Sequence, residues 1–251
     1  MKLLKSNFQF FWSIYCIVGF FAMILVAFVV FRMQYFFFKK KYETQFKDFL
    51  FRGIGKATRM LFFIKVKDIY HTEYNKSQSY IIVGNHNAAV DIPINTSSCP
   101  KNINIKFLGK AEAGKLPVLG VLIKSLSVLV DRKSAESRQS TFRFMSAEIE
   151  KGYSIFIYPE GTRNRTKEPL KEFYDGAFKL AIDHQLPLVV CTLIGTKIIN
   201  SPDKTMSFLP GRVDAHWEIP IETKGKTMED LPALKEEVKA LMLQRLAQGF
   251  I

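Results

Sequence analysis

The hydrophobic residues divide the chain into two regions with different patterns. No residue from Ser6 to Phe31 is charged, and a run of about 26 uncharged residues is long enough to cross the hydrocarbon core of a bilayer as a helix. The next segment, from Tyr35 to Met60, mixes phenylalanine and leucine with lysine, which is typical of a helix that lies in the membrane plane. We therefore predict a membrane-anchoring segment of two helices over residues 1–60.

A cleaved signal peptide is the alternative to a retained anchor. The uncharged run is longer than the apolar part of such a peptide, and the bulky and basic residues from Arg32 to Lys41 do not resemble a small-residue cleavage site. Lys39, Lys40 and Lys41 suit anionic lipid headgroups, and the positive-inside rule places this basic flank in the cytoplasm. We therefore predict a retained anchor, either spanning the bilayer or confined to one leaflet, with the remaining domain on the cytoplasmic face.

Short apolar runs alternate with helical patterns from residue 61 onward. Period-two alternation and β-branched runs predict strands at 64–70, 80–83, 103–108, 127–130, 153–158 and 188–194, and within 206–217. Amphipathic runs predict helices at 88–96, 116–124, 134–150, 174–184 and 228–248. Ser134 is the expected N-cap of the third of these helices. The alternation predicts an α/β domain over residues 61–251, with a mostly parallel mixed sheet flanked by helices.

Charge and cysteine content narrow the classes of partner. The formal net charge is +13, which favours anionic partners such as nucleic acid, acidic lipid surfaces or phosphorylated substrates. No basic stretch outside the membrane segment carries interleaved aromatic residues, so the sequence does not favour nucleic-acid binding. The three cysteines, Cys16, Cys99 and Cys191, are isolated, and they support neither a disulfide framework nor a structural metal site. These features predict a reducing compartment and membrane lipids as partners.

His86 and Asp91 form the first candidate site, after the strand predicted at 80–83. A step of five residues in a continuous helix turns about 500°, which leaves the two side chains roughly 140° apart. They can therefore meet only if His86 lies in the turn before the helix, and Gly84-Asn85 supplies such a turn. An aspartate bound to one imidazole nitrogen leaves the other nitrogen as a general base. The structural alternative is a polar loop histidine beside an aspartate that caps a helix.

The second candidate site follows the strand predicted at 153–158 and reads Tyr158-Pro159-Glu160-Gly161-Thr162-Arg163. Gly161 permits close approach of the backbone, and Arg163 offers a planar fork of donors. Successive backbone N–H groups with an arginine form a good phosphate seat. The alternative is an ordinary turn with a solvated arginine. Ligand sites in such sheets gather beyond the carboxyl ends of the strands, where both this loop and the His86 loop are predicted.

Two further groups carry charge at the ends of predicted elements. Asp131-Arg132 follows the strand at 127–130, and Arg132 either binds a phosphate or pairs with Asp131. Lys110-Ala111-Glu112 leads into a segment that contains Pro117, and its alternative role is a loop that starts a helix. No glycine-rich nucleotide loop, H-E-x-x-H helix or G-x-S-x-G elbow is present in the sequence.

These four groups, in this order, resemble the glycerolipid acyltransferase family, and most closely the 1-acyl-glycerol-3-phosphate acyltransferases. The matching blocks are Asn85 to Asp91 for N-H-x4-D, Phe107 to Gly120, Val130 to Arg132, and Tyr158 to Arg165 for F-P-E-G-T-R-S-R. The departures are Tyr158 for Phe, Asn164 for Ser, and Val189-Val190-Cys191 for V-P-V. The last departure weakens only the assignment of a hydrophobic tunnel. The resemblance covers roughly residues 64–220.

The resemblance implies a reaction and a role for each matching residue. His86 would deprotonate the acceptor hydroxyl while Asp91 holds His86, and the alkoxide would attack an acyl thioester without a covalent acyl-enzyme. The donor would be acyl-CoA or acyl carrier protein, with no metal and no other cofactor. The remaining roles are binding of the acceptor phosphate by Arg163 and Arg132, shaping of that seat by Glu160, Gly161 and Thr162, and stabilisation of the oxyanion by Lys110.

The expected product is phosphatidic acid, formed from lysophosphatidic acid during phospholipid biosynthesis. Two alternatives remain beside it. One is an acyltransferase that uses another lyso-lipid or glycerol-3-phosphate as acceptor. The other is a non-enzymatic, membrane-anchored lipid-binding protein, against which the intact pair of His86 and Asp91 argues, because a binding protein needs no base.

Overall fold

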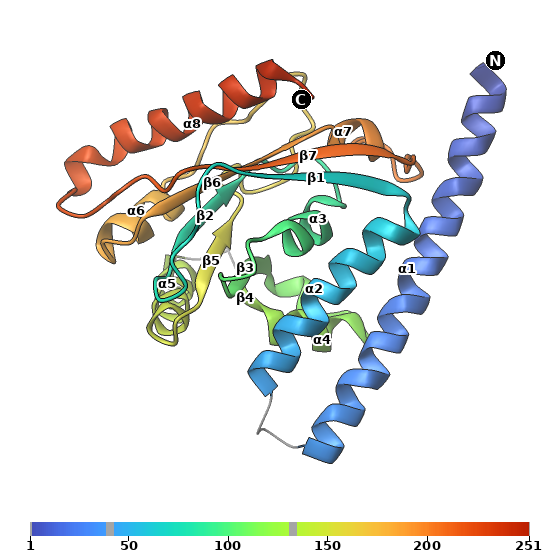
Figure 1. Ribbon diagram of the computed structural model, residues 1–251, viewed down its shortest axis with the longest axis horizontal. Helices are drawn as coiled ribbons and strands as arrows, with labels where there is room; N and C mark the ends of the chain where they lie inside the picture. Colours follow the sequence, from blue (N-terminus) through green and yellow to red (C-terminus); the bar gives the residue numbers. More distant parts are fainter. Residues whose placement is uncertain (1, 39–42, 131–134, 251) are drawn as a thin grey trace.

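Strands and helices alternate after two N-terminal helices in the computed structural model, which describes residues 2–38, 43–130 and 135–250 (Figure 1). The strands are β1 (Ile64–Tyr70), β2 (Ile81–Gly84), β3 (Ile105–Lys110), β4 (Ser127–Val130), β5 (Ser154–Ile157), β6 (Leu188–Ile194) and β7 (Gly211–Trp217). The helices are α1 (Lys2–Phe38), α2 (Glu43–Leu61), α3 (Asp91–Ser98), α4 (Leu119–Leu126), α5 (Ala135–Glu150), α6 (Gly176–Asp183), α7 (Thr196–Ile199) and α8 (Leu231–Gln248). Two 3-10 turns, η1 (Ala111–Lys115) and η2 (Met228–Asp230), precede α4 and α8.

The strands form one sheet in the order β1-β7-β6-β2-β5-β3-β4. Among the described residues, only the pairing of β6 with β7 is antiparallel, and the other pairings are parallel. The structure therefore confirms a mixed, mostly parallel sheet. Strands β2 to β6 run in the same direction, so their carboxyl ends lie on the same side of the sheet, whereas β1 and β7 run in the opposite direction. The loops that follow β2 and β5 consequently start side by side.

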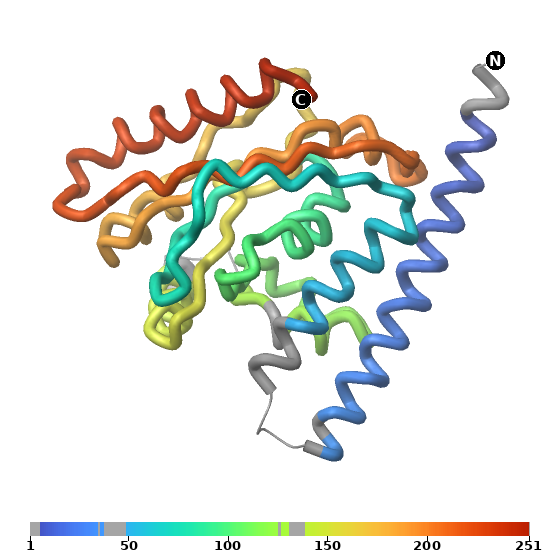
Figure 2. The backbone as a smooth tube through the Cα atoms, viewed as in Figure 1, coloured from blue at the N-terminus to red at the C-terminus, as the bar shows by residue number. Residues whose placement is uncertain are grey.

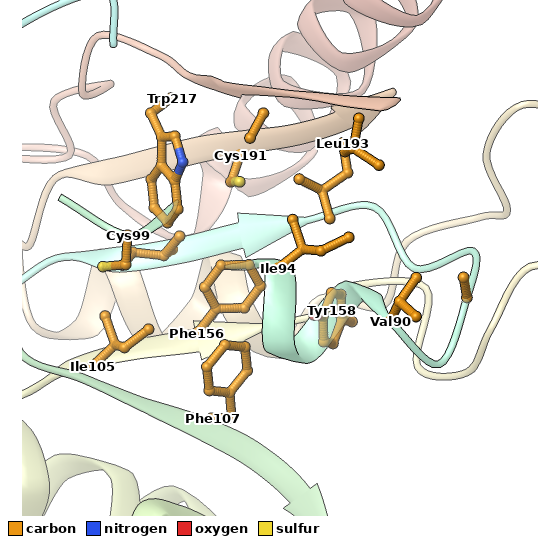
Figure 3. Close-up of a cluster of buried hydrophobic side chains, with 14 of the residues drawn as sticks. Val90, Ile94, Cys99, Ile105, Phe107, Phe156, Tyr158, Cys191, Leu193 and Trp217 are labelled. Carbon is orange, nitrogen blue, oxygen red and sulfur yellow. The ribbon is translucent and has the colours of Figure 1, made fainter. Parts of the chain in front are cut away.

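Alternate residues of the central strands face two different helical layers, as the pleat of a strand requires. Phe156 belongs to a core that includes Ile94 of α3 (Figure 3). Ile82 belongs to the same core. Ile81 and Ile155 belong to a second core, which contains residues of α6 and α8. Both faces of β2 and β5 are buried, which explains why these strands are continuous apolar runs instead of alternating ones.

Helix α8 confirms the amphipathic helix that the C-terminal pattern predicts. Its buried residues Leu234, Val238 and Met242 recur every four positions and face the second core. The turn η2 before it is closed by a capping box between Thr227 and Asp230.

Helix α1 lies along one side of the protein (Figure 2). One face of this helix is packed against the rest of the chain and the other is exposed. Ser13 and Cys16 are buried, and Ser13 Oγ accepts a hydrogen bond from the backbone N–H of Phe208 at 3.0 Å. The exposed face carries Phe11, Val18, Phe21, Leu25, Val26, Val29 and Met33. By length and composition, Ser6–Gln34 is apolar enough to cross a membrane. The exposed apolar face suits association with a membrane.

Helix α2 crosses α3 at a backbone contact that requires glycine. A Cβ atom on Gly55 would lie 2.5 Å from the carbonyl oxygen of Pro93 and 3.0 Å from the backbone nitrogen of Ser97. The Arg52 guanidinium donates at 2.6–3.1 Å to three carbonyl oxygens just beyond α3, those of Cys99, Pro100 and Ile103. These contacts fix α3, which begins with Asp91, against the N-terminal helices.

Several predicted boundaries differ from those in the structure. The helix predicted at 88–96 begins at Asp91, because the residues before it form the loop that holds His86. The helix predicted from residue 116 begins at Leu119, because η1 occupies the preceding segment. The strands predicted within 206–217 reduce to β7 and a bridge between Asn200 and Phe208. Helix α7 was not predicted, since four residues are too few to show a helical period.

Some predictions concern residues outside the described ranges. These residues are the lysines Lys39, Lys40 and Lys41, the Asp131-Arg132 pair and the N-cap Ser134. The division of the chain at residue 60 stays a prediction, and α2 ends close to it, at Leu61.

Candidate active site

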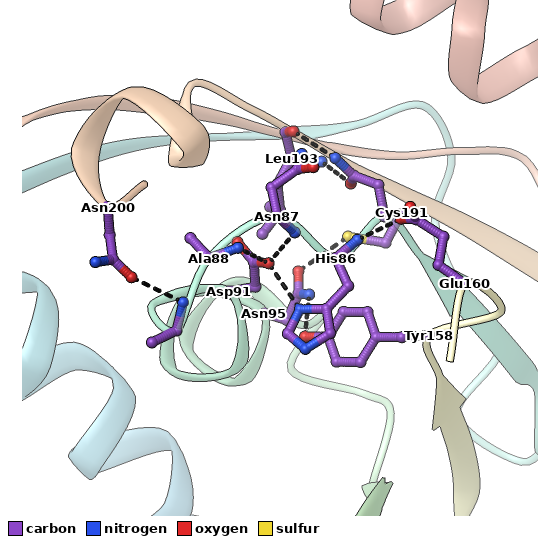
Figure 4. Close-up of polar contacts among 12 residues, drawn as sticks. His86, Asn87, Ala88, Asp91, Asn95, Tyr158, Glu160, Cys191, Leu193 and Asn200 are labelled. Atoms are coloured by element: carbon purple, nitrogen blue, oxygen red, sulfur yellow. Dashed lines mark hydrogen bonds and ion pairs between the residues drawn. The ribbon is translucent and has the colours of Figure 1, made fainter. Parts of the chain in front are cut away.

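An asparagine ties the start of the loop between β2 and α3 to the neighbouring strand β6. Asn85 Nδ2 donates to the carbonyl oxygen of Leu193 at 2.9 Å, and Asn85 Oδ1 accepts from the backbone N–H of Leu193 at 2.8 Å. Farther along the loop, the backbone N–H of Ala89 donates to Asn200 Oδ1 at 2.9 Å (Figure 4). The loop that carries His86 is therefore held at two points.

His86 and Asp91 are paired, as their spacing predicts. His86 Nδ1 lies 2.9 Å from Asp91 Oδ2, with Asp91 at the first residue of α3 and His86 in the loop before it (Figure 4). The Asp91 side chain is fully buried, whereas the His86 side chain is 16% exposed. Because Nδ1 is bound to the carboxylate, Nε2 is the nitrogen that remains for a substrate.

Two backbone N–H groups join His86 at the same oxygen of Asp91. Oδ2 accepts from Asn87 at 2.6 Å and from Ala88 at 2.7 Å. Oδ1 is buried and has no hydrogen-bond partner within the described part of the chain. Three donors converging on one oxygen fix the direction of the carboxylate, and the carboxylate in turn fixes the tautomer and orientation of His86.

Glu160 joins the His86 loop to the loop that follows β5. Its Oε1 accepts from the backbone N–H of His86 at 2.8 Å, and its Oε2 accepts from that of Lys171 at 3.0 Å. The backbone N–H of Asn164 also donates to the carbonyl oxygen of His86 at 2.6 Å. Burial raises the pKa of Glu160, although the two N–H donors act in the opposite direction. The Glu160 side chain is fully buried. It therefore holds the two loops together from the protein interior by accepting a hydrogen bond from each of them.

The phenol ring of Tyr158 fixes the plane of the His86 ring. The two rings stack, with centroids 4.1 Å apart and an angle of 18° between their planes. Asn95 Nδ2 donates to the Tyr158 hydroxyl at 3.0 Å. Burial raises the pKa of Tyr158 well above its usual value, so the phenol is neutral beside the imidazole.

A cavity of about 840 Å³, here called the lipid cavity, opens beside His86. Its apolar walls come from the four helices α1 to α4 and include Phe20, Ile24, Phe51, Ile54, Ile92, Leu119, Leu122 and Ile123. Its polar end contains Lys110, Arg163, Arg165 and Lys171, and no carboxylate occurs among its described lining residues. The cavity therefore offers an apolar space for an alkyl chain and cations for an anionic group, with His86 in the same lining.

The structure brings most of the predicted site residues to this cavity. Five of them line it, namely His86, Lys110, Gly161, Thr162 and Arg163. Asp91 and Glu160 are buried behind it and reach it through their bonds to His86. Arg132, the remaining predicted site residue, lies outside the described ranges.

A protein-family model matches the part of the chain that carries both site loops. The family model called Acyltransferase matches residues 65–194, which is just over half of the chain and includes both site loops. The chain belongs to the acyltransferase family.

Curated relatives of this acyltransferase chain have related names. The 1-acyl-sn-glycerol-3-phosphate acyltransferase of Haemophilus influenzae is 29% identical over 194 residues, covering 75% of this chain and 77% of the relative. The corresponding alpha proteins of mouse and human are 26% identical over 185 residues and cover 72% of this chain. The match spans 62% of the length of these mammalian relatives.

A solved structure shows the same fold over the whole acyltransferase chain. The 1-acyl-sn-glycerophosphate acyltransferase PlsC from Thermotoga maritima superimposes with a TM-score of 0.79, covering 99% of this chain and 97% of that one. The sequence identity of this pair is 18%. The likeness therefore includes the two N-terminal helices as well as the sheet.

Sequence reasoning about the acyltransferase missed the role of Lys171. Its Nζ donates to Thr162 Oγ1 at 2.8 Å, and its backbone N–H holds Glu160. Lys171 lies in a polar loop without periodicity, so only its distance from the Arg163 motif could have drawn attention to it. Arg165 belonged to a recognised block but had no role, and the structure places it in the cationic end of the lipid cavity.

Metal-ligating side chains gather elsewhere in the acyltransferase. Within the described ranges, the one group of three such residues is His71, His216 and Glu218, at the carboxyl ends of β1 and β7. Because β7 runs antiparallel to β6, the carboxyl end of β7 lies beside the amino end of β6, and this group is therefore at the opposite end of the strands from His86. At the candidate site itself, His86 Nδ1 and the carboxylate of Asp91 are bound to each other.

Proposed function

We propose that this acyltransferase moves a fatty acyl group from a thioester to the free hydroxyl of 1-acyl-glycerol-3-phosphate, which gives phosphatidic acid for phospholipid biosynthesis. The observation that carries the proposal is the His86–Asp91 pair in a cavity that has apolar walls and a cationic end. The names of the bacterial and mammalian relatives support this choice of acceptor.

His86 acts as the general base in the proposed reaction. Its Nε2 takes the proton of the acceptor hydroxyl while the oxygen forms a bond to the thioester carbonyl carbon. The tetrahedral intermediate then loses its C–S bond, and the departing thiolate takes the proton back from His86. Asp91 stabilises the imidazolium between these two steps. Protons and electrons balance without a covalent acyl-enzyme, a metal or another cofactor.

The cationic end of the lipid cavity supports an acceptor that carries a phosphate monoester. Arg163 offers a planar fork for two phosphate oxygens, and Arg165 and Lys171 add positive charge beside it. We assign Lys110 to the oxyanion of the tetrahedral intermediate, because it lies at the end of β3 and lines the same cavity. Arg132 is proposed as a second phosphate ligand from the sequence pattern alone.

The N-terminal helices support delivery of the acceptor from a membrane. The exposed apolar face of α1 suits the bilayer, and Phe20 and Ile24 of the same helix line the lipid cavity. Moving an acyl chain from the bilayer into water costs about 0.8 kcal/mol of free energy for each CH₂ group. Lateral transfer from the bilayer into an apolar cavity avoids this cost. The basic residues after the apolar run support a site on the cytoplasmic face.

Turnover by the purified full-length protein tests the proposal. Acceptors are lysophosphatidic acid, a neutral-headgroup lysophospholipid and glycerol-3-phosphate, each offered with acyl-CoA and with acyl carrier protein. We expect transfer to lysophosphatidic acid to be fastest and to fall by at least about a hundredfold in His86→Ala. Preference for another acceptor would replace the proposed substrate. Binding of lipids without transfer from either donor would instead indicate a non-enzymatic lipid-binding protein.

A further inference from the structure

A second cavity lies on the other face of the sheet and meets the lipid cavity at the candidate site. Its volume is about 1090 Å³, and its lining comes mainly from α5, α6 and the end of β5, with a few residues of β3, η1 and β4. Met145, Ile157 and Ala177 in this lining belong to the core on the α6 and α8 side, whereas the lipid cavity adjoins α2 and α3. The two cavities share Leu108, Lys110, Tyr158, Gly161 and Thr162.

The charges in the second cavity differ from those in the lipid cavity. Its described lining contains two lysines, Lys110 and Lys179, and three carboxylates, Glu112, Asp175 and Asp183. Gln139, Phe142 and Tyr174 add amide, aromatic and phenol groups. Such a mixture suits neither a phosphate monoester, which needs a surplus of positive charge, nor an alkyl chain, which needs a dry apolar wall. It suits a long, mostly uncharged molecule with several amide and hydroxyl groups.

The chemistry of a thioester donor requires a second route out of the site. The donor carbonyl must lie beside His86, and two groups extend from it, the acyl chain and the thiol arm. The lipid cavity supplies apolar space and a cationic end for the acyl chain and the acceptor. The thiol arm of both acyl-CoA and acyl carrier protein is 4′-phosphopantetheine, an extended chain with two amides and one free hydroxyl that ends in a phosphate.

We propose that the second cavity binds the pantetheine arm of the acyl donor. This inference rests on the proposed function, because it assigns a place to the donor of that reaction. The arm passes the shared edge at Gly161 and Thr162, so that the sulfur lies near His86 and the released thiol departs through the second cavity. Lys179, which is exposed on α6 with its Nζ 5.8 Å from the centre of the Phe142 ring, supplies positive charge for the phosphate at the outer end of the arm.

Gly176 offers a way to narrow the second cavity without disturbing the core. It is the first residue of α6 and lines the cavity, and an added Cβ atom would meet no other atom within 4 Å. We expect Gly176→Phe to raise the KM for the donor about tenfold while the KM for lysophosphatidic acid changes less than about twofold. Ala240→Phe, at an exposed position of α8 away from both cavities, is the matched control.

A donor without the arm distinguishes this effect from general damage. With acyl-N-acetylcysteamine, which keeps the thioester and lacks most of pantetheine, Gly176→Phe and Ala240→Phe should have equal activity. Tyr174→Ala removes a lining side chain that is 71% exposed, so it is a second variant that leaves the core intact, and it should also raise the KM for the full donor. Acyl-CoA and acyl carrier protein should show the same increase, since they share the arm.

Three outcomes overturn the assignment. One is an unchanged donor KM in both variants, and another is an equal loss with the short thioester. The third is an increase for acyl carrier protein alone, which would indicate a surface for the carrier protein. If the wild-type protein transfers from no thioester, the proposed function fails together with this inference, whereas an active wild type with unaffected variants removes this inference only.

Discussion

Two histidine groups at opposite ends of the strands of the same sheet contain similar residues but have very different surroundings. His86 pairs with Asp91 at 2.9 Å and lines the lipid cavity. At the other end, His71 Nε2 lies 3.3 Å from His216 Nδ1 and 3.7 Å from Glu218 Oε1. None of these three residues lines either of the two described cavities.

The difference lies in what satisfies the carboxylate. Glu218 is engaged by the Arg245 fork, with Nε 2.6 Å from Oε1 and a terminal nitrogen 3.0 Å from Oε2. A charge that is already neutralised by a guanidinium has little left to offer an imidazolium. Asp91 is held by neutral N–H donors, so its negative charge remains available to His86. In this chain, the stronger candidate for a base is therefore His86, because its carboxylate partner binds no other cation among the described contacts and a cavity reaches its ring.

Removing each histidine should separate the two groups most clearly. His86→Ala should lower kcat by about 10² to 10⁴, because a general base is lost, and should leave the melting temperature within a few degrees. His71→Ala, the matched control at the other end of the strands, should keep activity within about threefold of wild type. Initial rates with lysophosphatidic acid and circular dichroism check both. Near-normal activity of the first variant would remove the base from His86.

Neutralising each carboxylate should give effects of different kinds. Asp91→Asn should lower kcat by about 10², at the lower end of the general-base range. Glu218→Gln should leave kcat unchanged and lower the free energy of unfolding by about 1–3 kcal/mol, because the largely buried Arg245 fork loses its charged partner. Rates and urea denaturation measure the two effects. If Glu218→Gln stayed folded and still lost activity, Glu218 would have more than the structural role that distinguishes it here from Asp91.

The two arginine forks should respond differently to replacement by lysine. Arg163 lines the lipid cavity beside other cations, so Arg163→Lys should raise the KM for the acceptor about three- to tenfold and leave the KM for the donor nearly unchanged. Arg245→Lys should affect only stability, since its fork binds Glu218. Equal increases in the KM of both substrates would contradict the phosphate role of Arg163.

The smallest expected effect is a dependence of stability on pH at the far end of the strands. Burial, with Arg245 and His71 nearby, lowers the pKa of His216 below its usual value. The unfolded chain therefore binds a proton first as the pH falls, and the free energy of unfolding should decrease below about pH 6.5. Above that pH the group contributes no pH dependence. His216→Gln should flatten this part of the profile in urea titrations, and an unchanged slope would assign it to other groups.

Much of the fold was predictable because the parallel strands are short, apolar and separated by helical patterns. β1, β4 and β6 have the predicted bounds, and the other strands lie within a few residues of theirs. The η1 turn and α7 were missed, because each is shorter than two helical turns and has no period to detect. The alternation of Ile81 and Ile82 between two cores was also hidden, since a strand buried on both faces shows no polar residues that mark a side.

The candidate site was predictable where adjacent residues in the sequence act together, as in the loop from His86 to Asp91. The bond from Glu160 to the backbone of His86 was not, because it joins loops 74 residues apart. The wall that Phe20 and Ile24 contribute to the lipid cavity was hidden for a different reason. Their apolar run indicated only membrane association, whereas the packing of α1 on α2 and α4 makes the same helix part of the site.

The backbone contact at Gly55 couples the N-terminal helices rigidly to α3. Because no side chain separates α2 from the Pro93 carbonyl at Gly55, little flexible material at this crossing can absorb a displacement of one helix against the other. On a bilayer, the depth at which the N-terminal helices settle therefore sets the height of the loop before α3. A thinner or thicker hydrocarbon layer would raise or lower His86 relative to the glycerol backbones of the surrounding lipids. Membrane thickness would thus affect how far His86 reaches, through the close backbone contact at Gly55 and the hydrogen bonds of Arg52.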